Sequence, residues 1–319
     1  MSASEQIKIW DYKDFAEMNM AANEGMIDSF QESFGALQLR YWRAKEDSFK
    51  GAQKVLFVVH GIGEHSGRYH ELAQYLNLKG FHVCSLDLSG HGLSSSLQLK
   101  KRSHLRSFEQ MSWDLTKALI QVIRLKFKDK NVEFSLFGHS LGALLSLKWL
   151  KDMQTRFKKE LNDEGFRGMN STFVSAPPLK LSLPVPAWKK LIANKLNKVI
   201  PHYKMSNEIA LEMLSYDFVN QKAYQKDKWN HSRVSSHLFL SILKTAEEIK
   251  QSVASFSNCD LALAVGQDDR IVEPKAIEQF YQSLESPQKK FYLIRNAKHE
   301  IFNEVQRQMC YERLIEWII

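Results

Sequence analysis

The chain has 319 residues, of which 44% are hydrophobic and 25% charged, and its formal net charge is +8. This length fits one α/β domain with a substantial insertion better than one small domain or two large ones. The three cysteines (Cys84, Cys259 and Cys310) are far apart and follow no zinc-binding spacing, so we expect buried free thiols. The basic balance indicates an anionic partner, but no zinc-finger spacing, RNP-like aromatic pattern or dense basic tail points to nucleic acid.

The N-terminal segment MSASEQIKIWDYKDF lacks the basic start and apolar run of a secretory signal. No stretch of the sequence approaches the length of apolar residues that spans a bilayer. We therefore expect a cytoplasmic protein, at most peripheral at a membrane.

Strands and helices alternate along most of the chain. Residues 37–44 alternate apolar and polar side chains, which predicts a strand. The continuous apolar run KVLFVVH (54–60) predicts a strand buried on both faces, followed by a helix that Gly80 closes. Further strands are predicted over 81–88, 131–138, 171–178, 259–266 and 289–295, and further helices over 111–122, 141–150, 274–284 and 302–318. This order predicts an α/β fold, a mostly parallel sheet with helices on both faces.

The alternation stops between Pro178 and about Leu243, where the pattern is helical. An insertion of this length after a core strand predicts a cap over the active site. We therefore expect a core over 1–177 and 244–319 and a helical cap over 178–243.

One predicted cap helix is basic and amphipathic. Its apolar face carries Trp188, Leu191, Ile192, Leu196 and Val199, and four lysines lie mostly elsewhere, namely Lys189, Lys190, Lys195 and Lys198. This pattern is typical of peripheral contact with an anionic membrane surface, and also of a cap helix packed on the core.

Residues Gly138 to Gly142 match G-x-S-x-G between a predicted strand and a predicted helix. In α/β hydrolases this sequence forms a strained turn that exposes the nucleophilic serine. Ser140 would also lie at a helix N-terminus, whose partial positive charge favours a developing oxyanion. The sequence therefore predicts Ser140 as a nucleophile.

A serine hydroxyl needs a base to accept its proton, and the expected chain order is serine, acid, histidine. Three of the four histidines after Ser140 lie in the predicted cap, whereas His299 follows the last predicted strand. We therefore predict His299 as the base. Asp268 and Asp269 directly follow the strand 259–266, and we favour Asp269 as the acid, with Asp268 as the alternative.

Two backbone N–H groups are expected to face the oxyanion. One belongs to Leu141, directly after the nucleophile, and the other to Ile62 in the Gly-containing loop after the strand 54–60. This chemistry needs no metal and no cofactor.

Five strings carry a family resemblance: HGIGEHSGRY, LDLSGHGLSS, GHSLGA, GQDDRIV and KHEIFNE. They resemble the monoacylglycerol lipase and lysophospholipase branch of the α/β hydrolases, from about Gly35 to the C-terminus. The resemblance implies the α/β-hydrolase fold, supports Asp269 and Ile62, and places Glu64 and Arg68 near the polar end of the substrate pocket. The alternative for Glu64 and Arg68 is a salt bridge that fixes their loop.

The chain departs from this family at two positions. Phe302 stands where monoacylglycerol lipases carry a second histidine near the head group, and Ala143 replaces a common glycine. We expect a serine carboxylic-ester hydrolase acting on lysophospholipids or monoacylglycerols through an acyl-enzyme on Ser140. The alternatives are an aminopeptidase or short-chain esterase on the same fold, and a non-catalytic lipid-binding protein.

Overall fold

The computed structural model describes residues 8–10, 26–32, 35–44, 52–94, 107–128, 131–182, 187–200 and 203–319. Within these residues, nine strands form the central sheet in the order β1-β2-β3-β5-β4-β6-β7-β10-β11. The strands are β1 (Lys8–Trp10), β2 (Met26–Glu32), β3 (Gly35–Trp42), β4 (Gln53–Val59), β5 (His82–Asp87), β6 (Val132–His139), β7 (Met169–Ser175), β10 (Leu261–Gly266) and β11 (Lys289–Ile294). Neighbouring strands pair antiparallel from β1 through β2 and β3 to β5, and pair parallel along the rest of this order, β5-β4-β6-β7-β10-β11.

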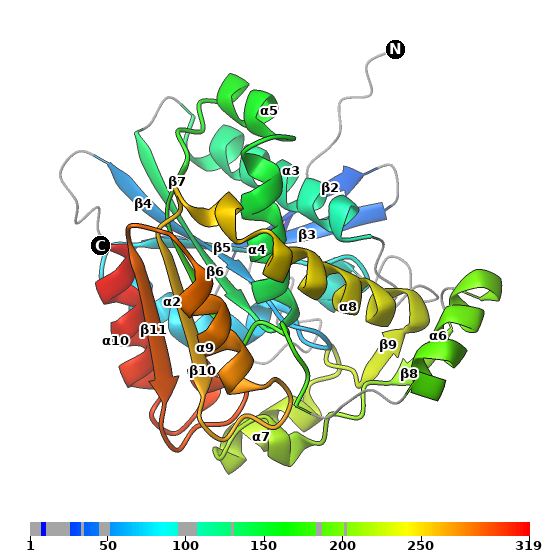
Figure 1. Cartoon of the computed structure of the whole chain (residues 1–319). Coiled ribbons are helices and arrows are strands. Elements are labelled where there is room, and N and C mark those ends of the chain that lie inside the picture. Colours follow the sequence, from blue (N-terminus) through cyan, green and yellow to red (C-terminus); the bar gives the residue numbers. More distant parts are fainter. Residues whose placement is uncertain are drawn as a thin grey trace.

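Helices cover both faces of this sheet (Figure 1). Those of the core are α2 (His70–Asn77), α3 (Phe108–Lys126), α4 (Leu141–Met153), α5 (Lys158–Asp163), α9 (Pro274–Ser283) and α10 (Arg307–Ile318). The last predicted helix starts later than expected, because η5 (Ile301–Asn303) precedes it as a separate turn. The predicted mostly parallel sheet with helices on both faces is confirmed.

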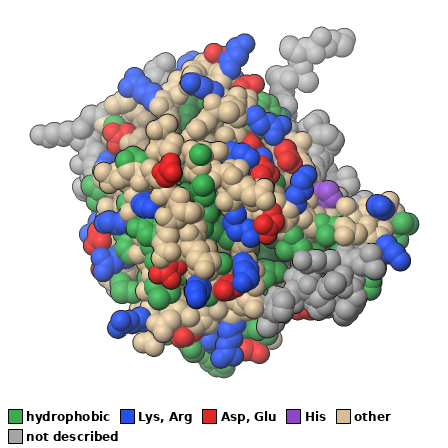
Figure 2. All heavy atoms as spheres, in the orientation of Figure 1, with side chains coloured by type: hydrophobic (Ala, Val, Ile, Leu, Met, Phe, Trp, Pro, Cys, Tyr) green, Lys and Arg blue, Asp and Glu red, His purple; other side chains and the backbone are tan. Residues whose placement is uncertain are grey.

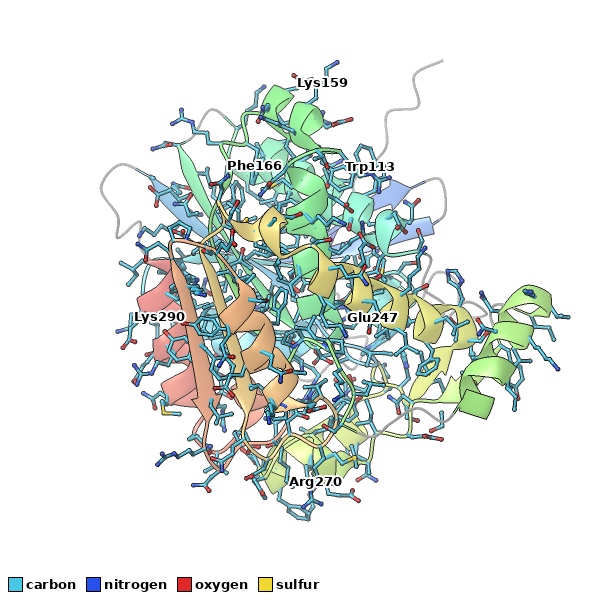
Figure 3. The ribbon with its side chains drawn as sticks, in the orientation of Figure 1. Trp113, Lys159, Phe166, Glu247, Arg270 and Lys290 are labelled. Carbon is cyan, nitrogen blue, oxygen red and sulfur yellow. The ribbon has the colours of Figure 1, made fainter. Side chains whose placement is uncertain are left out.

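The core consists of two apolar layers, one on each face of the sheet. In β4, Val55, Phe57 and Val59 contribute to the layer under α3, α4 and α9. Leu56 and Val58 contribute to the opposite layer under α2 and α10. All five side chains are fully buried because successive residues of a strand point to opposite faces. Side chains fill the space between the helices and the sheet (Figure 3), and the three cysteines are buried and free.

The inserted segment after β7 is only partly helical. It contains α6 (Ala187–Val199), β8 (Lys204–Ser206), η3 (Leu211–Met213), α7 (Phe218–Lys226) and β9 (Arg233–Ser235), followed by α8 (Ser236–Gln251). The antiparallel pair of β8 and β9 was not predicted, because three-residue strands give no periodic signal. Helix α8 packs on both α6 and α4 and continues past residue 243, so we propose that the cap ends at β9.

The parallel strands place their carboxyl ends at one edge of the sheet, on the side where α7 and the β8–β9 pair lie, toward the bottom of the view (Figure 1). Ligand sites of open α/β sheets lie at this edge. No helix in the described part of the chain combines the length and apolar composition needed to cross a bilayer.

Candidate active site

Ser140 occupies a strained turn between β6 and α4. Its φ of 51° and ψ of −117° are unusual for a residue with a side chain. The turn brings the first residues of α4 against the end of the neighbouring strand β4, and a Cβ on Gly142 would lie 2.1 Å from the carbonyl oxygen of Val59. The Ser140 N–H donates to the Ser175 carbonyl at 2.8 Å, which holds the turn in place. The hydroxyl is thereby presented at the carboxyl edge of the sheet.

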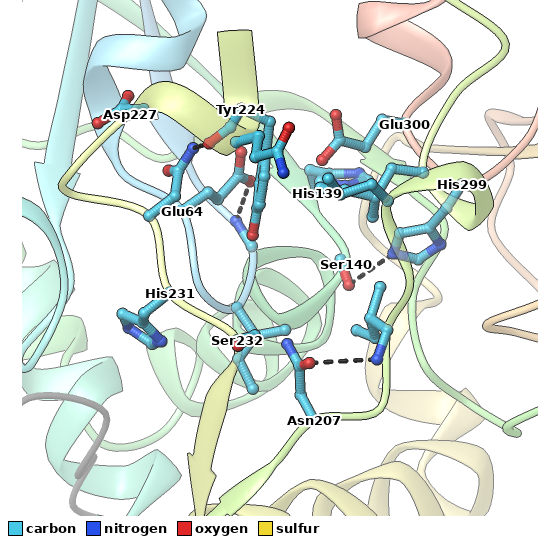
Figure 4. A pocket seen from close by; sticks show the side chains of 17 residues that line it. Glu64, His139, Ser140, Asn207, Tyr224, Asp227, His231, Ser232, His299 and Glu300 are labelled. Carbon is cyan, nitrogen blue, oxygen red and sulfur yellow. Dashed lines mark hydrogen bonds between the residues drawn. The ribbon is translucent and has the colours of Figure 1, made fainter. Parts of the chain in front are cut away.

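The imidazole of His299 lies between Ser140 and Asp269. Its Nε2 is 2.9 Å from the Ser140 Oγ, and its Nδ1 is 2.8 Å from the Asp269 Oδ2. An acceptor carboxylate at Nδ1 fixes the proton there, so Nε2 is free to accept the serine proton. Figure 4 shows His299 and Ser140 meeting at one side of the pocket.

The structure distinguishes the two neighbouring aspartates. The second oxygen of Asp269 accepts hydrogen bonds from the N–H groups of Ile271 and Val272 at 2.8 and 3.0 Å, which fixes the carboxylate. Asp268 instead accepts from the Tyr216 hydroxyl at 3.2 Å. Of the two, Asp269 is the residue brought to His299.

Two adjacent imidazoles have opposite electrostatic environments. Burial alone lowers the pKa of His299, but the Asp269 carboxylate, with smaller contributions from Glu300 and Glu64, raises it above its ordinary value of 6.5. Burial, reinforced by His299, lowers the pKa of His139 to about 4. The two rings are 5.0 Å apart. His299 is therefore suited to accept a proton near neutral pH, while His139 stays neutral.

The loop after β4 carries the first predicted oxyanion donor, Ile62, which lines the pocket. Gly63 on this loop accepts hydrogen bonds from the cap, from the His231 N–H at 2.9 Å and the Tyr224 hydroxyl at 3.2 Å. Leu141, the second predicted donor, is the first residue of α4. Backbone N–H groups in a first helical turn lack intrahelical acceptors, so this one can serve an anion. The oxyanion role of both stays a prediction.

Glu64 and Arg68 form a buried ion pair in which Arg68 Nη1 is 2.7 Å from the Glu64 Oε2. Glu64 lines the pocket, together with Glu300, which the sequence reasoning did not identify. Arg68 donates to both oxygens of Glu300 at 2.7 Å. Glu300 lies directly after His299 in KHEIFNE, and that adjacency was the signal available in the sequence.

Polar and apolar cap residues close the pocket over Ser140, and the volume of this pocket is about 290 Å³. Its lining from the cap comprises Asn207, Ile209, Leu211, Leu214, Tyr224, Gln225, Asp227, Asn230, His231 and Ser232 (Figure 4). Asp227 also contacts the core, with its Oδ2 2.7 Å from the Nε2 of His65. Among the described residues, no group of three or more His, Cys, Asp or Glu side chains is arranged to hold a metal ion.

Residues 50–306 match the family described as "Serine aminopeptidase, S33". The chain is 26% identical to phospholipase YtpA of Bacillus subtilis, over 80% of this chain and 90% of that protein. It is 28% identical to the monoglyceride lipase of Rattus norvegicus, over 83% and 80% of the two chains. An uncharacterized abhydrolase domain-containing protein of Dictyostelium discoideum is 30% identical over 88% of this chain, which spans only 27% of that protein.

Solved structures of lipases resemble the chain in fold. The monoacylglycerol lipase of Paleococcus ferrophilus superposes with a TM-score of 0.72 at 25% identity, covering 88% of this chain and 98% of that one. A soluble variant of the Saccharomyces cerevisiae monoglyceride lipase, which shares the fold, has a TM-score of 0.76 at 18% identity, covering 94% and 96%. The chain therefore belongs to the serine aminopeptidase S33 family, in the monoacylglycerol lipase and lysophospholipase branch of the α/β hydrolases, and is a serine ester hydrolase.

Proposed function

We propose that this hydrolase cleaves the acyl ester of single-chain glycerolipids through an acyl-enzyme on Ser140. The observation that carries the proposal is the hydrogen-bonded series Asp269–His299–Ser140 at the floor of the pocket. The serine oxygen attacks the ester carbonyl as His299 Nε2 takes its proton. The ester C–O bond then breaks, and His299 returns that proton to the leaving alcohol. Water then attacks the acyl-enzyme as His299 takes a proton from it. The bond between the acyl group and the Ser140 oxygen breaks, and His299 returns the proton to Ser140.

The amides of Ile62 and Leu141 are proposed to hold the oxyanion. They come from separate segments, the loop after β4 and the first residue of α4. Donors fixed before the reaction stabilise the charge that develops on the carbonyl oxygen without reorganising. Asp269 stabilises the imidazolium that forms in the same step.

The pocket lining favours a neutral head group over a phosphate. Among the described lining residues are the carboxylates Glu64, Asp227 and Glu300 but neither Lys nor Arg. Phe302 packs against Phe137 with a ring-centroid distance of 4.5 Å and is not among the described lining residues, so the position that carries a second histidine in monoacylglycerol lipases contributes nothing to this pocket. We infer that cap amides such as Asn207 and Asn230 bind the glycerol hydroxyls, which makes monoacylglycerol the preferred substrate.

A hydrolysis panel tests this proposal. The substrates are 1-oleoylglycerol, oleoyl lysophosphatidylcholine, oleoyl lysophosphatidic acid and p-nitrophenyl butyrate, with Ser140→Ala as the control. We expect the highest kcat/KM among the lipids on 1-oleoylglycerol and the lowest on lysophosphatidic acid. Hydrolysis of none of the three lipids, or equal hydrolysis by Ser140→Ala, would overturn the proposal.

Aminopeptidase activity is the second candidate, because carboxylates can bind the ammonium group of a peptide. In this pocket, however, Glu64 and Glu300 are already paired with Arg68, and Asp227 with His65. An aminoacyl p-nitroanilide added to the panel separates the two functions. Turnover of the anilide above that of every ester would favour the peptidase.

We further propose that α6 contacts an anionic membrane surface. Ile192 and Val199 on this helix and Ile200 directly after it are exposed at 45, 78 and 42%. Lys195 and Lys198 are exposed on the same helix. Figure 2 shows basic and hydrophobic side chains at this end of the molecule, on the right of the view. The side chains of residues 188–191, which include the predicted Trp188, Lys189 and Lys190, lie outside the described ones.

Flotation with phosphatidylglycerol-containing vesicles tests this contact. Changing Lys195 and Lys198 to Gln is expected to reduce binding, because each basic residue near an anionic surface contributes about 1 kcal/mol. The matched control changes Lys158 and Lys159, which are exposed on α5 (Figure 3). Equal loss in both variants would show general charge attraction and would contradict a role for α6.

A further inference from the structure

A buried carboxylate organises the loop that carries Ile62. Glu64 Oε1 accepts hydrogen bonds from the Gly61 N–H and from the Tyr69 hydroxyl, the latter at 2.8 Å. The loop is therefore closed on itself by the Glu64 side chain. Because Glu64 is only 2% exposed, solvent cannot replace these bonds.

A single guanidinium connects this loop to the loop of the base. Arg68 Nη1 is 2.7 Å from the Glu64 Oε2 and 2.7 Å from the Glu300 Oε1, and Nη2 is 2.7 Å from the Glu300 Oε2. Glu300 directly follows His299. The three side chains are 3 to 8% exposed. We call this set, Glu64–Arg68–Glu300, the arginine clamp.

The cap covers the same guanidinium. The ring of Tyr224 on α7 lies 4.6 Å from the Arg68 Cζ, and Asn220 accepts from Nη2 at 3.4 Å. These contacts and the two carboxylates occupy both terminal nitrogens and one face of the guanidinium. Arg68 is also not among the described residues that line the pocket, whereas Glu64 and Glu300 are (Figure 4).

We propose that Arg68 is a positioning residue, which sets the imidazole of His299 relative to the oxyanion loop through the arginine clamp, and that it is not a head-group ligand. The planar fork of an arginine fixes the direction of two carboxylates at once, which a lysine cannot do. This role rests on the proposed function only in assigning His299 as base and Ile62 as oxyanion donor. It does not depend on which ester is the substrate.

The clamp also sets the electrostatic surroundings of His299. The charged groups that act on this imidazole are Asp269 after β10, Glu300 on its own loop and Glu64 after β4, and His139 at the end of β6 lies beside it. The Arg68 guanidinium is paired with both glutamates and faces Tyr224 on the cap. Glu300 and Glu64 both raise the pKa of His299. Removing a carboxylate charge and removing the arginine charge should therefore shift the acid limb of activity in opposite directions.

Three variants test the proposal: Arg68→Lys, Arg68→Met and Glu300→Gln. Each is assayed on p-nitrophenyl acetate, which has no polyol head group, and on 1-oleoylglycerol. A displaced base slows both substrates, since a misplacement of about 1 Å can cost roughly 10²-fold in rate. We expect Arg68→Lys to lower kcat by a similar factor on both, with little change in KM. A raised KM for 1-oleoylglycerol alone, with normal p-nitrophenyl acetate kinetics, would overturn the proposal and make Arg68 a head-group ligand.

The pH profile of kcat/KM separates positioning from a general loss of stability. We expect Arg68→Met to move the acid limb to higher pH, Glu300→Gln to move it to lower pH, and Arg68→Lys to leave it in place. If the acid limb did not move in Arg68→Met and Glu300→Gln, or moved in the same direction in both, the proposed role of the arginine clamp would be contradicted. If Arg68→Met does not fold, Arg68→Lys and Glu300→Gln still decide the question, because Arg68→Lys keeps the positive charge of the site and Glu300→Gln keeps the side-chain volume.

Lys148→Met is the matched control. Lys148 is 5% exposed and joins two carboxylates, Asp152 at 2.8 Å and Glu248 at 3.1 Å, between α4 and α8. We expect this variant to lose thermal stability but to keep the kcat and pH profile of the wild type. If the wild-type enzyme did not hydrolyse lipids, the proposed substrate would be wrong. The role of Arg68 could still be tested, because the variants can be compared on p-nitrophenyl acetate.

Discussion

Replacing Gly63 by alanine should separate the placement of the loop proposed to carry an oxyanion donor from the stability of the fold. Gly63 has φ +74°, and a Cβ there would lie 2.2 Å from the backbone oxygen of His231. Real Cβ contacts essentially never fall below 3.0 Å, so the loop and the cap must separate by about 1 Å. The left-handed conformation itself costs an alanine about 1–2 kcal/mol.

Gly165 provides the matched control, because it has φ +77° but nothing within 4 Å of a built Cβ. Gly165→Ala therefore has the same backbone cost without the collision. Both variants are compared by urea unfolding and by kcat on p-nitrophenyl butyrate. We expect the left-handed backbone conformation to lower the free energy of unfolding by a similar amount in both variants. We expect kcat to fall, by roughly 10²-fold, in Gly63→Ala alone. Equal kcat in the two variants would refute the reasoning that the hydrogen bonds of Gly63 to the cap position the loop of Ile62 for catalysis.

Three further outcomes follow from the site. The pKa of His299 is raised above 6.5, and the neutral imidazole is the base. We therefore expect kcat/KM to fall as pH drops through a value above 6.5. An apparent pKa of kcat/KM below 6.5 would contradict the ion pair with Asp269. Asp269→Asn should reduce kcat by about 10⁴-fold, as tautomer loss does in protease triads, whereas Asp268→Asn should change it little. The Arg68 guanidinium overcomes burial to lower the pKa of Glu64 from 4.5 to about 2. Stability from Glu64 is therefore present above pH 4.5 and lost as pH falls through its lowered pKa, and Glu64→Gln should abolish this pH dependence in urea unfolding at several pH values.

The sheet and the triad could be predicted because their signals are local. Each signal consists of residues that are close together in the sequence. These signals are the run of apolar residues in β4, the G-x-S-x-G turn at Ser140 and the acidic pair after β10. Parallel strands then place the carboxyl ends together, which is why Asp269 and His299 meet Ser140 although they are distant in sequence.

The cap and the clamp could not be predicted in the same way. The three-residue strands β8 and β9 are stabilised by pairing with each other, not by propensity. The pairing of Arg68 with Glu300 spans 232 positions, and nothing in the local sequence of either residue specifies the other. The resemblance to lipases placed Glu64 and Arg68 near the pocket, with a salt bridge between them as the alternative. The structure has this salt bridge and adds Glu300 as a second carboxylate on Arg68.

The activation of Ser140 by His299 is the central claim, and covalent labelling tests it most directly. The protein is treated with a fluorophosphonate probe, and the modified residue is identified by peptide mass spectrometry in the wild type and in His299→Ala. We predict one adduct, on Ser140, that forms at least 10²-fold more slowly, by the general-base contribution, when the imidazole is removed. An adduct on another residue, or labelling of Ser140 at the same rate in both proteins, would contradict the mechanism.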